Sequence, residues 1–197
     1  MPTGLHKQKP AVELSRVTRH AGKCLIYQDI NWRDPSGAER VWETVERVND
    51  RAAVMTIPWL LPSQKLVLIR QYRPPAKSCV LEFPAGLIDE GEDAITAALR
   101  ELHEEAGYVG RVTRLIPPTY NTPGLSGEAV YQAFIAIDET FATNKNPCPK
   151  PDDGEFIEVV TVAKTDFAGF IEHELSAGSA FDSKVMAYML GASGVTA

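Results

Sequence analysis

The sequence predicts an α+β fold, in which strands and helices are mixed without a regular βαβ alternation. Two observations carry this prediction. Apolar and polar residues alternate on both sides of a turn in the N-terminal quarter, and strand-like apolar runs recur later in the chain. One central segment and two C-terminal segments have apolar residues at helical spacing instead. With 197 residues, 44% of them hydrophobic, the chain can hold one large domain, or one domain with a small appendage.

The N-terminal part of the chain is expected to form a region of its own. Residues 1–20 are polar and unpatterned, which predicts a loose arm. Residues 24–48 predict a β-hairpin, because the alternating runs flank the turn residues Asp34-Pro35-Ser36-Gly37. We therefore divide the chain into an N-terminal region, 1–50, and a main domain, 51–197.

The main domain is expected to contain both kinds of element. Strands are predicted where apolar runs are bounded by turn residues, at 52–61, 65–73, 79–83, 111–120, 129–138 and 155–163. Amphipathic helices are predicted at 93–106, 167–175 and 183–190. The proline-rich segment 144–155 predicts a loop.

Charge and cysteine usage narrow the class of protein. A net charge of -6 and a pI near 5.3 argue against a nucleic-acid polymer or an anionic membrane as partner. Cys24, Cys79 and Cys148 are scattered without a metal-binding spacing, so we expect reduced thiols. The chain has no apolar run of membrane-spanning length, and its first residues lack the apolar core of a secretion signal. The expectation is a cytoplasmic protein, with nuclear entry left open.

The helix predicted at 93–106 carries an unusual cluster of like charge. On a helix that turns by about 100° per residue, the apolar residues fall within about 60° of one direction. This predicted buried stripe consists of Ile95, Ala98, Leu99, Leu102 and Ala106. Glu101, Glu104 and Glu105 share the neighbouring arc, while Arg100 is expected to point to another side, at about 140°.

Carboxylates at this spacing repel one another, at a cost of about 0.2–0.5 kcal/mol per pair. One explanation is a solvated acidic face, which is what most charge runs are. The other is a site for a hard cation such as Mg²⁺ or Mn²⁺, whose binding would remove the repulsion. Helix geometry alone leaves both open.

The spacing around this helix resembles the signature of the Nudix hydrolase family, G-x5-E-x7-R-E-U-x-E-E-x-G-U, where U is a bulky apolar residue. The matching positions are Gly86, Glu92, Arg100, Glu101, Leu102, Glu104, Glu105 and Gly107, with Tyr108 where an aliphatic residue is commoner. The resemblance implies a Nudix-type α/β/α sandwich around a mixed sheet, preceded by a small antiparallel β domain.

The resemblance also implies a Mg²⁺ site, with Mn²⁺ as a substitute. Glu101, Glu105 and the backbone carbonyl of Ala85 are the implied ligands, with Glu104 binding directly or through water. Arg100 is implied to hold these acids in register.

Several stretches outside the signature resemble the ADP-sugar pyrophosphatase branch of the family, whose best-known substrate is ADP-ribose. They are "VWETVER", "RQYRPP", "EFPAGLID", "NTPGLSGE" and "PDDGEFIEV", and together with the signature they cover most of residues 24–192. This resemblance implies Mg²⁺-dependent hydrolysis of ADP-ribose and other ADP-sugars to AMP and a sugar phosphate. It also implies a homodimer formed through the N-terminal β region.

Individual roles follow from the resemblance, position by position. Trp42 is implied to stack on adenine, an interaction that contributes about 1–3 kcal/mol per base; the alternative is a core tryptophan on an alternating strand. Arg47 and Arg73 are implied to contact the diphosphate and its sugars. Glu82 is implied to lie near the metals, and Leu125 to line the terminal ribose pocket.

Two further positions concern catalysis and base recognition. Relatives place a candidate general base at the position of Glu155, although an exposed loop acid is the plain alternative. Some relatives sandwich adenine between two tryptophans, the first from the partner subunit, and that first position aligns with Cys24 here. Either Trp32 supplies the second aromatic contact, or the base is held on one face only.

Two other functions stay open at this point. A Nudix enzyme that removes oxidised nucleoside di- or triphosphates would share the signature, but would not need the N-terminal strands or "NTPGLSGE". A non-catalytic Nudix domain that senses ADP-ribose typically lacks one of the paired glutamates, and this chain keeps Glu101, Glu104 and Glu105.

Overall fold

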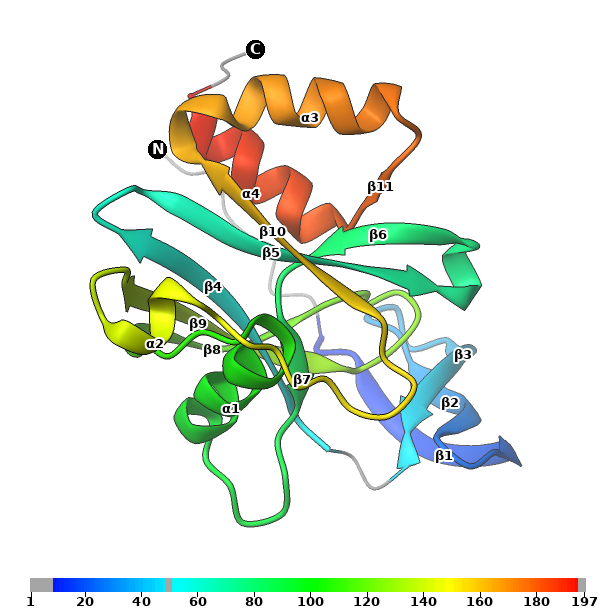
Figure 1. The fold of residues 1–197 in the computed structure, drawn as a ribbon. Coiled ribbons are helices and arrows are strands. Elements are labelled where there is room, and N and C mark those ends of the chain that lie inside the picture. The colour runs from blue at the N-terminus through cyan, green and yellow to red at the C-terminus, as the bar shows by residue number, and fades with distance from the viewer. Residues whose placement is uncertain (1–8, 49–50, 195–197) are drawn as a thin grey trace, which may run out of the picture. The chain divides into compact units, whose positions relative to one another are not determined.

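The structure is a computed structural model that describes residues 9–48 and 51–194. The described residues form two compact units. One contains residues 9–48, 51 and 52 together with Thr119–Ala129, and the other contains Ala53–Pro118 and residues 130–194 (Figure 1).

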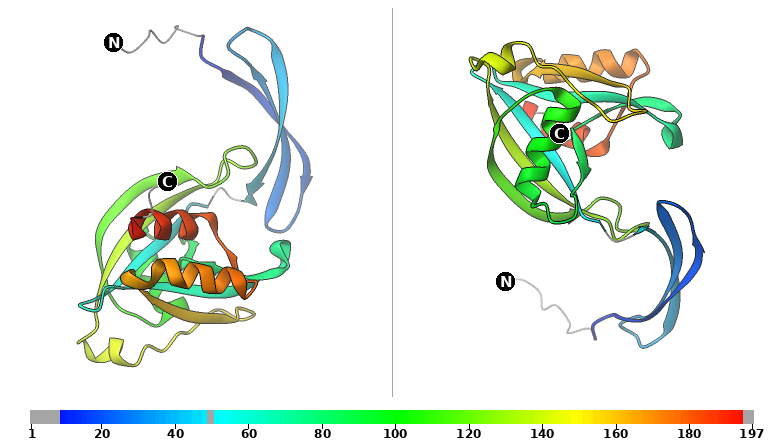
Figure 2. Two further views of the ribbon diagram at one scale, coloured as in Figure 1. Left: turned by 90° about the horizontal axis from the view of Figure 1, so that it is seen from above. Right: turned by 60° about the horizontal axis from the view of Figure 1, so that its bottom comes forward.

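The first unit is built on a three-stranded antiparallel sheet. Its strands are β1 (Val12–Ala21), β2 (Leu25–Arg33) and β3 (Glu39–Arg47), in the order β1-β2-β3. The predicted hairpin is confirmed, since β2 and β3 pair in continuous register from Leu25 opposite Arg47 to Arg33 opposite Glu39. Both views of Figure 2 show the three strands as one curved ribbon.

The hairpin turn is held by the side chain of its first residue. The Asp34 carboxylate accepts hydrogen bonds from the Ser36 hydroxyl, from Arg40 and from the backbone N–H groups of Ser36 and Ala38. These bonds, led by the one from Ser36, hold the pKa of Asp34 well below its usual range. Gly37 supplies the positive φ, 95°, that the turn requires.

The expectation of a loose N-terminal arm is wrong for residues 12–20. Residues 12–20 belong to β1, which pairs with β2 along almost its whole extent. The register shifts twice, between Glu13 and Ser15 and between Thr18 and His20. Such bulges break the alternation that would identify a strand in the sequence. Residues 1–8 of the predicted arm lie outside the described residues.

The second unit contains an eight-stranded mixed sheet, with main order β11-β6-β5-β4-β9-β8. Most pairs are antiparallel, but β4 pairs with β9 and β6 pairs with β11 in parallel. The strands are β4 (Ala53–Leu61), β5 (Lys65–Arg73), β6 (Ser78–Glu82), β7 (Ala85–Leu87), β8 (Arg111–Tyr120), β9 (Ala129–Asp138), β10 (Ile157–Ala163) and β11 (Ala180–Phe181). All six predicted strands are present, whereas β7 and β11 are too short to show a period.

Strand β4 changes partner along one edge, and this change positions the segment that begins β7. Its first residues pair with β7, and Trp59 and Leu60 pair with β5. Between these stretches, the backbone N–H and the hydroxyl of Thr56 both donate to the Pro84 carbonyl, at 2.8 and 3.0 Å. The chain at Pro84 and Ala85 is thereby fixed at an opening within the sheet.

Helices cover both faces of this sheet, which confirms the predicted α/β/α layering (Figure 1). Helix α1 (Ala94–Ala106) packs on one face with Val54 and Val67. Helices α3 (Phe167–Ser176) and α4 (Ser183–Ser193) pack on the other face, against Met55 and Leu68. Adjacent strand residues thus point to opposite layers, as the two-residue period of a strand requires.

The remaining helical elements are short. Those whose bounds lie within the described residues are α2 (Ala142–Lys145) and the 3₁₀ turns Pro74–Ala76 and Lys164–Asp166. Within the part of the chain that the structure describes, no helix combines the length and the hydropathy needed to cross a membrane.

Candidate active site

Helix α1 covers the predicted range 93–106 except for Asp93, which caps its N-terminus. The Asp93 carboxylate accepts from the backbone N–H groups of Ile95 and Thr96 at the first turn. Gly107 ends the helix with φ 75°, and its N–H donates to the His103 carbonyl.

The predicted buried stripe of α1 is only partly correct. Ala98, Leu102 and Ala106 are fully buried, but Ile95 is 46% exposed. The buried face of the helix also includes an acidic residue, since Glu105 is only 4% exposed. The interpretation of the cluster as a solvated acidic face is therefore wrong for Glu105.

Glu105 is a buried acid with few compensating contacts. Its Oε2 accepts a hydrogen bond from the backbone N–H of Ala85 at 2.8 Å, which ties α1 to β7. The pKa of Glu105 is raised to about 8, mainly by burial. The charges of Glu101 and Glu155 contribute to this rise, whereas the Ala85 N–H and Arg73 oppose it. Burial likewise raises the pKa of Glu101. A nearby cation would stabilise the ionised forms of both Glu105 and Glu101.

Arg100 does not point away from the acids, contrary to the helical-wheel expectation. Its guanidinium donates to Glu92, to Glu101 at 2.8 Å and to Glu104 at 3.0 Å. It also donates to the backbone carbonyl of Leu87. The wheel gives the direction of Cα–Cβ, but the long side chain bends back along the helix, so one arginine connects three carboxylates to the loop before α1.

Gly86 makes the close approach of Glu101 to β7 feasible. A Cβ at position 86 would overlap the carboxylate of Glu101. The glycine therefore leaves a cradle in which that carboxylate lies directly against the backbone of β7. Ala85, on the same short strand, holds Glu105. Glu105 and Glu101 of α1 thus lie against two successive residues of β7, Ala85 and Gly86.

Arg73 and Glu82, predicted separately, lie together at the ends of β5 and β6. The Arg73 Nε donates to the Glu82 carboxylate at 2.9 Å, and Gln71 Nε2 donates to the same group at 3.0 Å. The Arg73 charge also lowers the pKa of Glu105. Arg73 and Glu82 therefore belong with the carboxylates of α1. Gln71, which sequence reasoning missed, offered no signal beyond its place in "RQYRPP".

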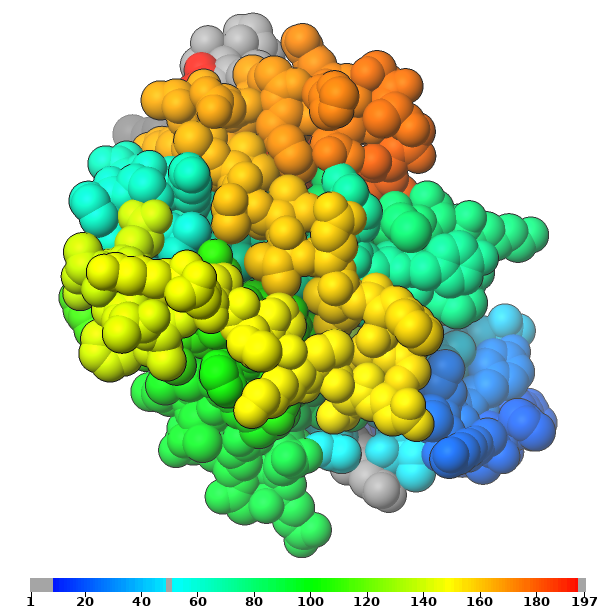
Figure 3. All heavy atoms as spheres, viewed as in Figure 1, coloured from blue at the N-terminus to red at the C-terminus, as the bar shows by residue number. Residues whose placement is uncertain are grey.

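Glu155 lies on a loop that is anchored to the end of α1. The Lys150 backbone N–H donates to the Glu104 carbonyl at 2.7 Å. A Cβ at Gly107 would lie 2.5 Å from the Cys148 nitrogen, so the loop backbone packs directly on this glycine. The space-filling view shows the segment between α2 and β10 at the surface beside α1 (Figure 3). Beyond the anchor, the charge of Glu155 acts on both Glu101 and Glu105.

The donor set fits a hard divalent cation, although no metal cluster is preformed. Across residues 9–48 and 51–194, no three His, Cys, Asp or Glu side chains are gathered so that they could hold a metal ion. The oxygens of Glu101 and Glu105 are turned instead toward Arg100 and the Ala85 N–H. Even so, the cradle at Gly86 and the raised pKa of Glu105 mark a place where carboxylates are crowded and short of positive charge. Carboxylate oxygens are the ligands that Mg²⁺ prefers.

A second group of predicted residues lies in the first unit. Trp42 is 48% exposed, so the alternative interpretation as a core tryptophan is wrong. Trp32 stands opposite Arg40, and Trp42 stands opposite Ile30, which places both tryptophans on one face of the hairpin as diagonal neighbours. The Trp32 Nε1 is buried and has no hydrogen-bond partner among the described residues. Cys24 precedes β2, and its carbonyl accepts from the Val48 N–H.

The segment Thr119–Ala129 contacts β3 through Leu125 and through Glu128. The Leu125 carbonyl accepts from the Val45 N–H at 3.1 Å and from the Thr44 hydroxyl at 3.0 Å. Arg47 forms an ion pair with Glu128, the last residue of "NTPGLSGE". The role of Glu128 in holding Arg47 could not be predicted, since it depends on how this distant loop folds back onto β3.

Comparisons with known proteins identify the family. Residues 49–183 match the NUDIX domain family. The chain is 40% identical to mouse ADP-sugar pyrophosphatase over 86% of its own length and 81% of the relative's, and 36% identical to ADP-ribose pyrophosphatase of Saccharomyces cerevisiae over 71% and 64%. A solved structure described as an ADP compounds hydrolase matches with a TM-score of 0.65 and 22% identity over 96% of this chain and 99% of that one, which supports the fold. This chain belongs to the Nudix family.

We predict that Gly107→Ala destabilises the protein and loosens the loop that carries Glu155. The positive φ costs about 1–2 kcal/mol for alanine, and the new Cβ would also displace the backbone at Cys148. The matched control is Gly91→Ala, because Gly91 has a similar φ of 80° but nothing within 4 Å of its Cβ position. Chemical denaturation and hydrogen exchange at residues 148–156 provide the measurement. Equal destabilisation by both variants, with unchanged exchange, would contradict the anchor.

Proposed function

We propose that this protein is a divalent-cation-dependent diphosphatase that hydrolyses ADP-ribose and related ADP-sugars to AMP and a sugar phosphate. The observation that carries the proposal is the packing of Glu105 and Glu101 against the backbone of Ala85 and Gly86. The charges of Glu155 and Arg73 also act on the pKa of Glu105. The names of the mouse and yeast relatives supply the substrate class.

The chemistry requires water to attack one phosphorus while the bond from that phosphorus to the bridging oxygen breaks. Glu155, on its anchored loop, is the proposed general base that accepts the proton of the attacking water. The bridging oxygen departs with the other phosphate and becomes one of its terminal oxygens. The water therefore supplies one oxygen to one product, and its protons are shared between the products and solvent.

Glu101, Glu105 and the Ala85 carbonyl would hold Mg²⁺, or Mn²⁺ in its place, with Glu104 as a further ligand. When bound, such an ion would draw negative charge from the diphosphate and lower the pKa of water. Arg100 keeps Glu101 and Glu104 oriented through its hydrogen bonds. Arg73 is proposed to orient the diphosphate, because a planar guanidinium fork matches phosphate oxygens and Glu82 already fixes its direction.

Base recognition is assigned to the first unit. Trp42 offers an exposed indole, and Trp32 shares its face of the sheet. We propose that Trp42 stacks on adenine and that Trp32 supports the same face. Arg47, held by Glu128, is proposed to contact the diphosphate, and Leu125 to line the pocket of the terminal sugar.

A homodimer formed through the N-terminal sheet is part of the proposal. The register of the sheet puts five exposed apolar side chains on the face opposite Trp42, namely Val12, Val17, Leu25, Tyr27 and Val41. A three-stranded sheet needs a packed apolar face for stability, and a second copy of the chain would supply one. We expect the enzyme to act in the cytoplasm, which agrees with its three free, exposed cysteines.

Glu105→Gln should lower kcat for ADP-ribose by about 10³-fold or more, since it removes one of the proposed metal ligands. Folding should survive, because the amide oxygen can still accept from the Ala85 N–H. The steady-state rate with Mg²⁺ and the rise in melting temperature that Mg²⁺ causes should fall together. Glu172→Gln, which removes an exposed carboxylate of α3, is the control. A variant at position 105 with wild-type turnover would refute the metal assignment.

Trp42→Ala should raise KM for ADP-ribose about tenfold or more while changing kcat less, because about 1–3 kcal/mol of stacking is lost. Trp42→Phe keeps an aromatic face and should recover part of the affinity. The measurement is a comparison of KM and kcat for ADP-ribose among wild type, Trp42→Ala and Trp42→Phe. If KM stays constant across the series, Trp42 does not bind the base.

Val41→Glu should convert the dimer to a monomer, since it places a charge in the proposed apolar interface, where Val41 is 60% exposed in the single chain. Thr18→Glu introduces the same charge on the opposite face and is the control. Light scattering after size-exclusion chromatography gives the mass. A wild-type protein that is monomeric at micromolar concentration would contradict this part of the proposal.

A further inference from the structure

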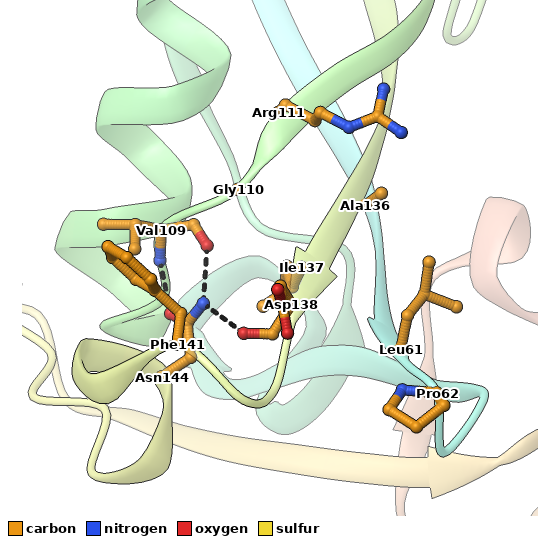
Figure 4. Close-up of a pocket in the computed structure, with 10 residues that line it drawn as sticks. All are labelled: Leu61, Pro62, Val109, Gly110, Arg111, Ala136, Ile137, Asp138, Phe141 and Asn144. Carbon is orange, nitrogen blue, oxygen red and sulfur yellow. Dashed lines mark hydrogen bonds between the residues drawn. The ribbon is translucent and has the colours of Figure 1, made fainter.

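The second unit contains a cavity that the proposed reaction does not use. Its volume is about 700 Å³, which is within the range of small-molecule sites. The lining residues, drawn in Figure 4, are Leu61, Pro62, Val109, Gly110, Arg111, Ala136, Ile137, Asp138, Phe141 and Asn144. None of them belongs to the carboxylate cluster of α1 or to its loop. The cavity is therefore separate from the candidate active site.

The walls of the cavity are mainly apolar, and part of that surface faces solvent. Leu61 is 42% exposed and Phe141 is 59% exposed, while Ile137 is fully buried and forms part of the lining. Large apolar side chains left open around a hollow would gain free energy from an apolar occupant. The exposed ring of Phe141 is suited to contact another flat ring.

The polar side chains of the lining differ in whether they already have hydrogen-bond or ion-pair partners. The Asn144 side chain is satisfied, because it accepts from the Val109 N–H and donates to the carbonyls of Val109 and Asp138. Asp138 Oδ1 accepts from the backbone and the hydroxyl of Thr140. These bonds tie α2 to the segment after α1, so that this wall is held in place without a ligand.

Arg111 is the exception. It is exposed at the start of β8 and forms no ion pair with any other residue that the structure describes. In Figure 4 its guanidinium extends away from Asp138, the one acid among the described residues of the lining. Besides its apolar walls and the Asp138 carboxylate, the lining therefore presents a guanidinium without an ion-pair partner among the described residues. Such a planar fork can hold a carboxylate or phosphate through two parallel hydrogen bonds.

We propose that this cavity binds a small aromatic anion, a flat ring that carries a carboxylate, sulfonate or phosphate group. The ring lies against Phe141 and Leu61, and the anionic group pairs with Arg111. The pairing sets the orientation of the ligand, and the apolar contact supplies most of the affinity. This site is additional to the diphosphatase site and does not depend on its assignment.

The test uses 8-anilinonaphthalene-1-sulfonate, an aromatic sulfonate whose fluorescence rises in an apolar site, titrated into the full-length protein. Wild type should show saturable binding. Arg111→Gln should weaken it about tenfold, as expected for loss of a charge-assisted hydrogen bond. Phe141→Ala should weaken it too, and truncation of this exposed ring leaves the core intact. Arg114→Gln removes the same charge from the same strand at a position outside the lining, and should bind as wild type does.

Equal probe affinity in the Arg111 and Arg114 variants would overturn the proposal, as would a wild type without saturable binding. Because Arg111 is exposed, its replacement should leave the melting temperature unchanged. A loss of affinity in that variant can then be assigned to the cavity.

Discussion

The arrangement of the candidate active site depends on one constraint, the packing of two carboxylates of α1 against the backbone of β7. Glu105 meets the Ala85 N–H, and Glu101 occupies the space that Gly86 leaves open. Burying these acids side by side is unfavourable, as the raised pKa of Glu105 indicates. Arg100 offsets part of the repulsion from the solvent side. The remaining shortage of positive charge is what makes the place suitable for a divalent cation.

Other parts of the second unit position β7 and α1 so that this packing can form. The change of partner along β4 creates the opening at which Thr56 fixes Pro84, and this sets the position of β7. Burial of Ala98, Leu102 and Ala106 fixes the rotation of α1, so that Glu105 faces the sheet. The packing of Cys148 on Gly107 then brings the Glu155 loop to the same end of the helix. The apolar core thus stabilises a fold in which Glu101 and Glu105 lie close together, although the proximity of these like charges is itself unfavourable.

Much of this fold could be predicted from local pattern, and the exceptions have physical causes. Turn chemistry at Asp34 and Gly37 and the two-residue period identified the hairpin, but two bulges concealed β1. The helical wheel located α1, but it could not show that Glu105 would be buried while Ile95 stays exposed, because that depends on what β7 presents. The reach of Arg100 and the pairing of Arg47 with Glu128 depend on side-chain conformation and on long-range folding, which periodicity does not encode. Of these features, only the contact of Arg100 with the acids was implied by the resemblance to the Nudix signature.

The most direct measurement is anomalous diffraction from crystals of the protein soaked with Mn²⁺. The account predicts a manganese peak bounded by the carboxylates of Glu101 and Glu105 and the carbonyl of Ala85, with the Glu105 carboxylate turned from its bond with the Ala85 N–H. Crystals without a peak there, in which both carboxylates keep only their contacts with Arg100 and the Ala85 N–H, would contradict it.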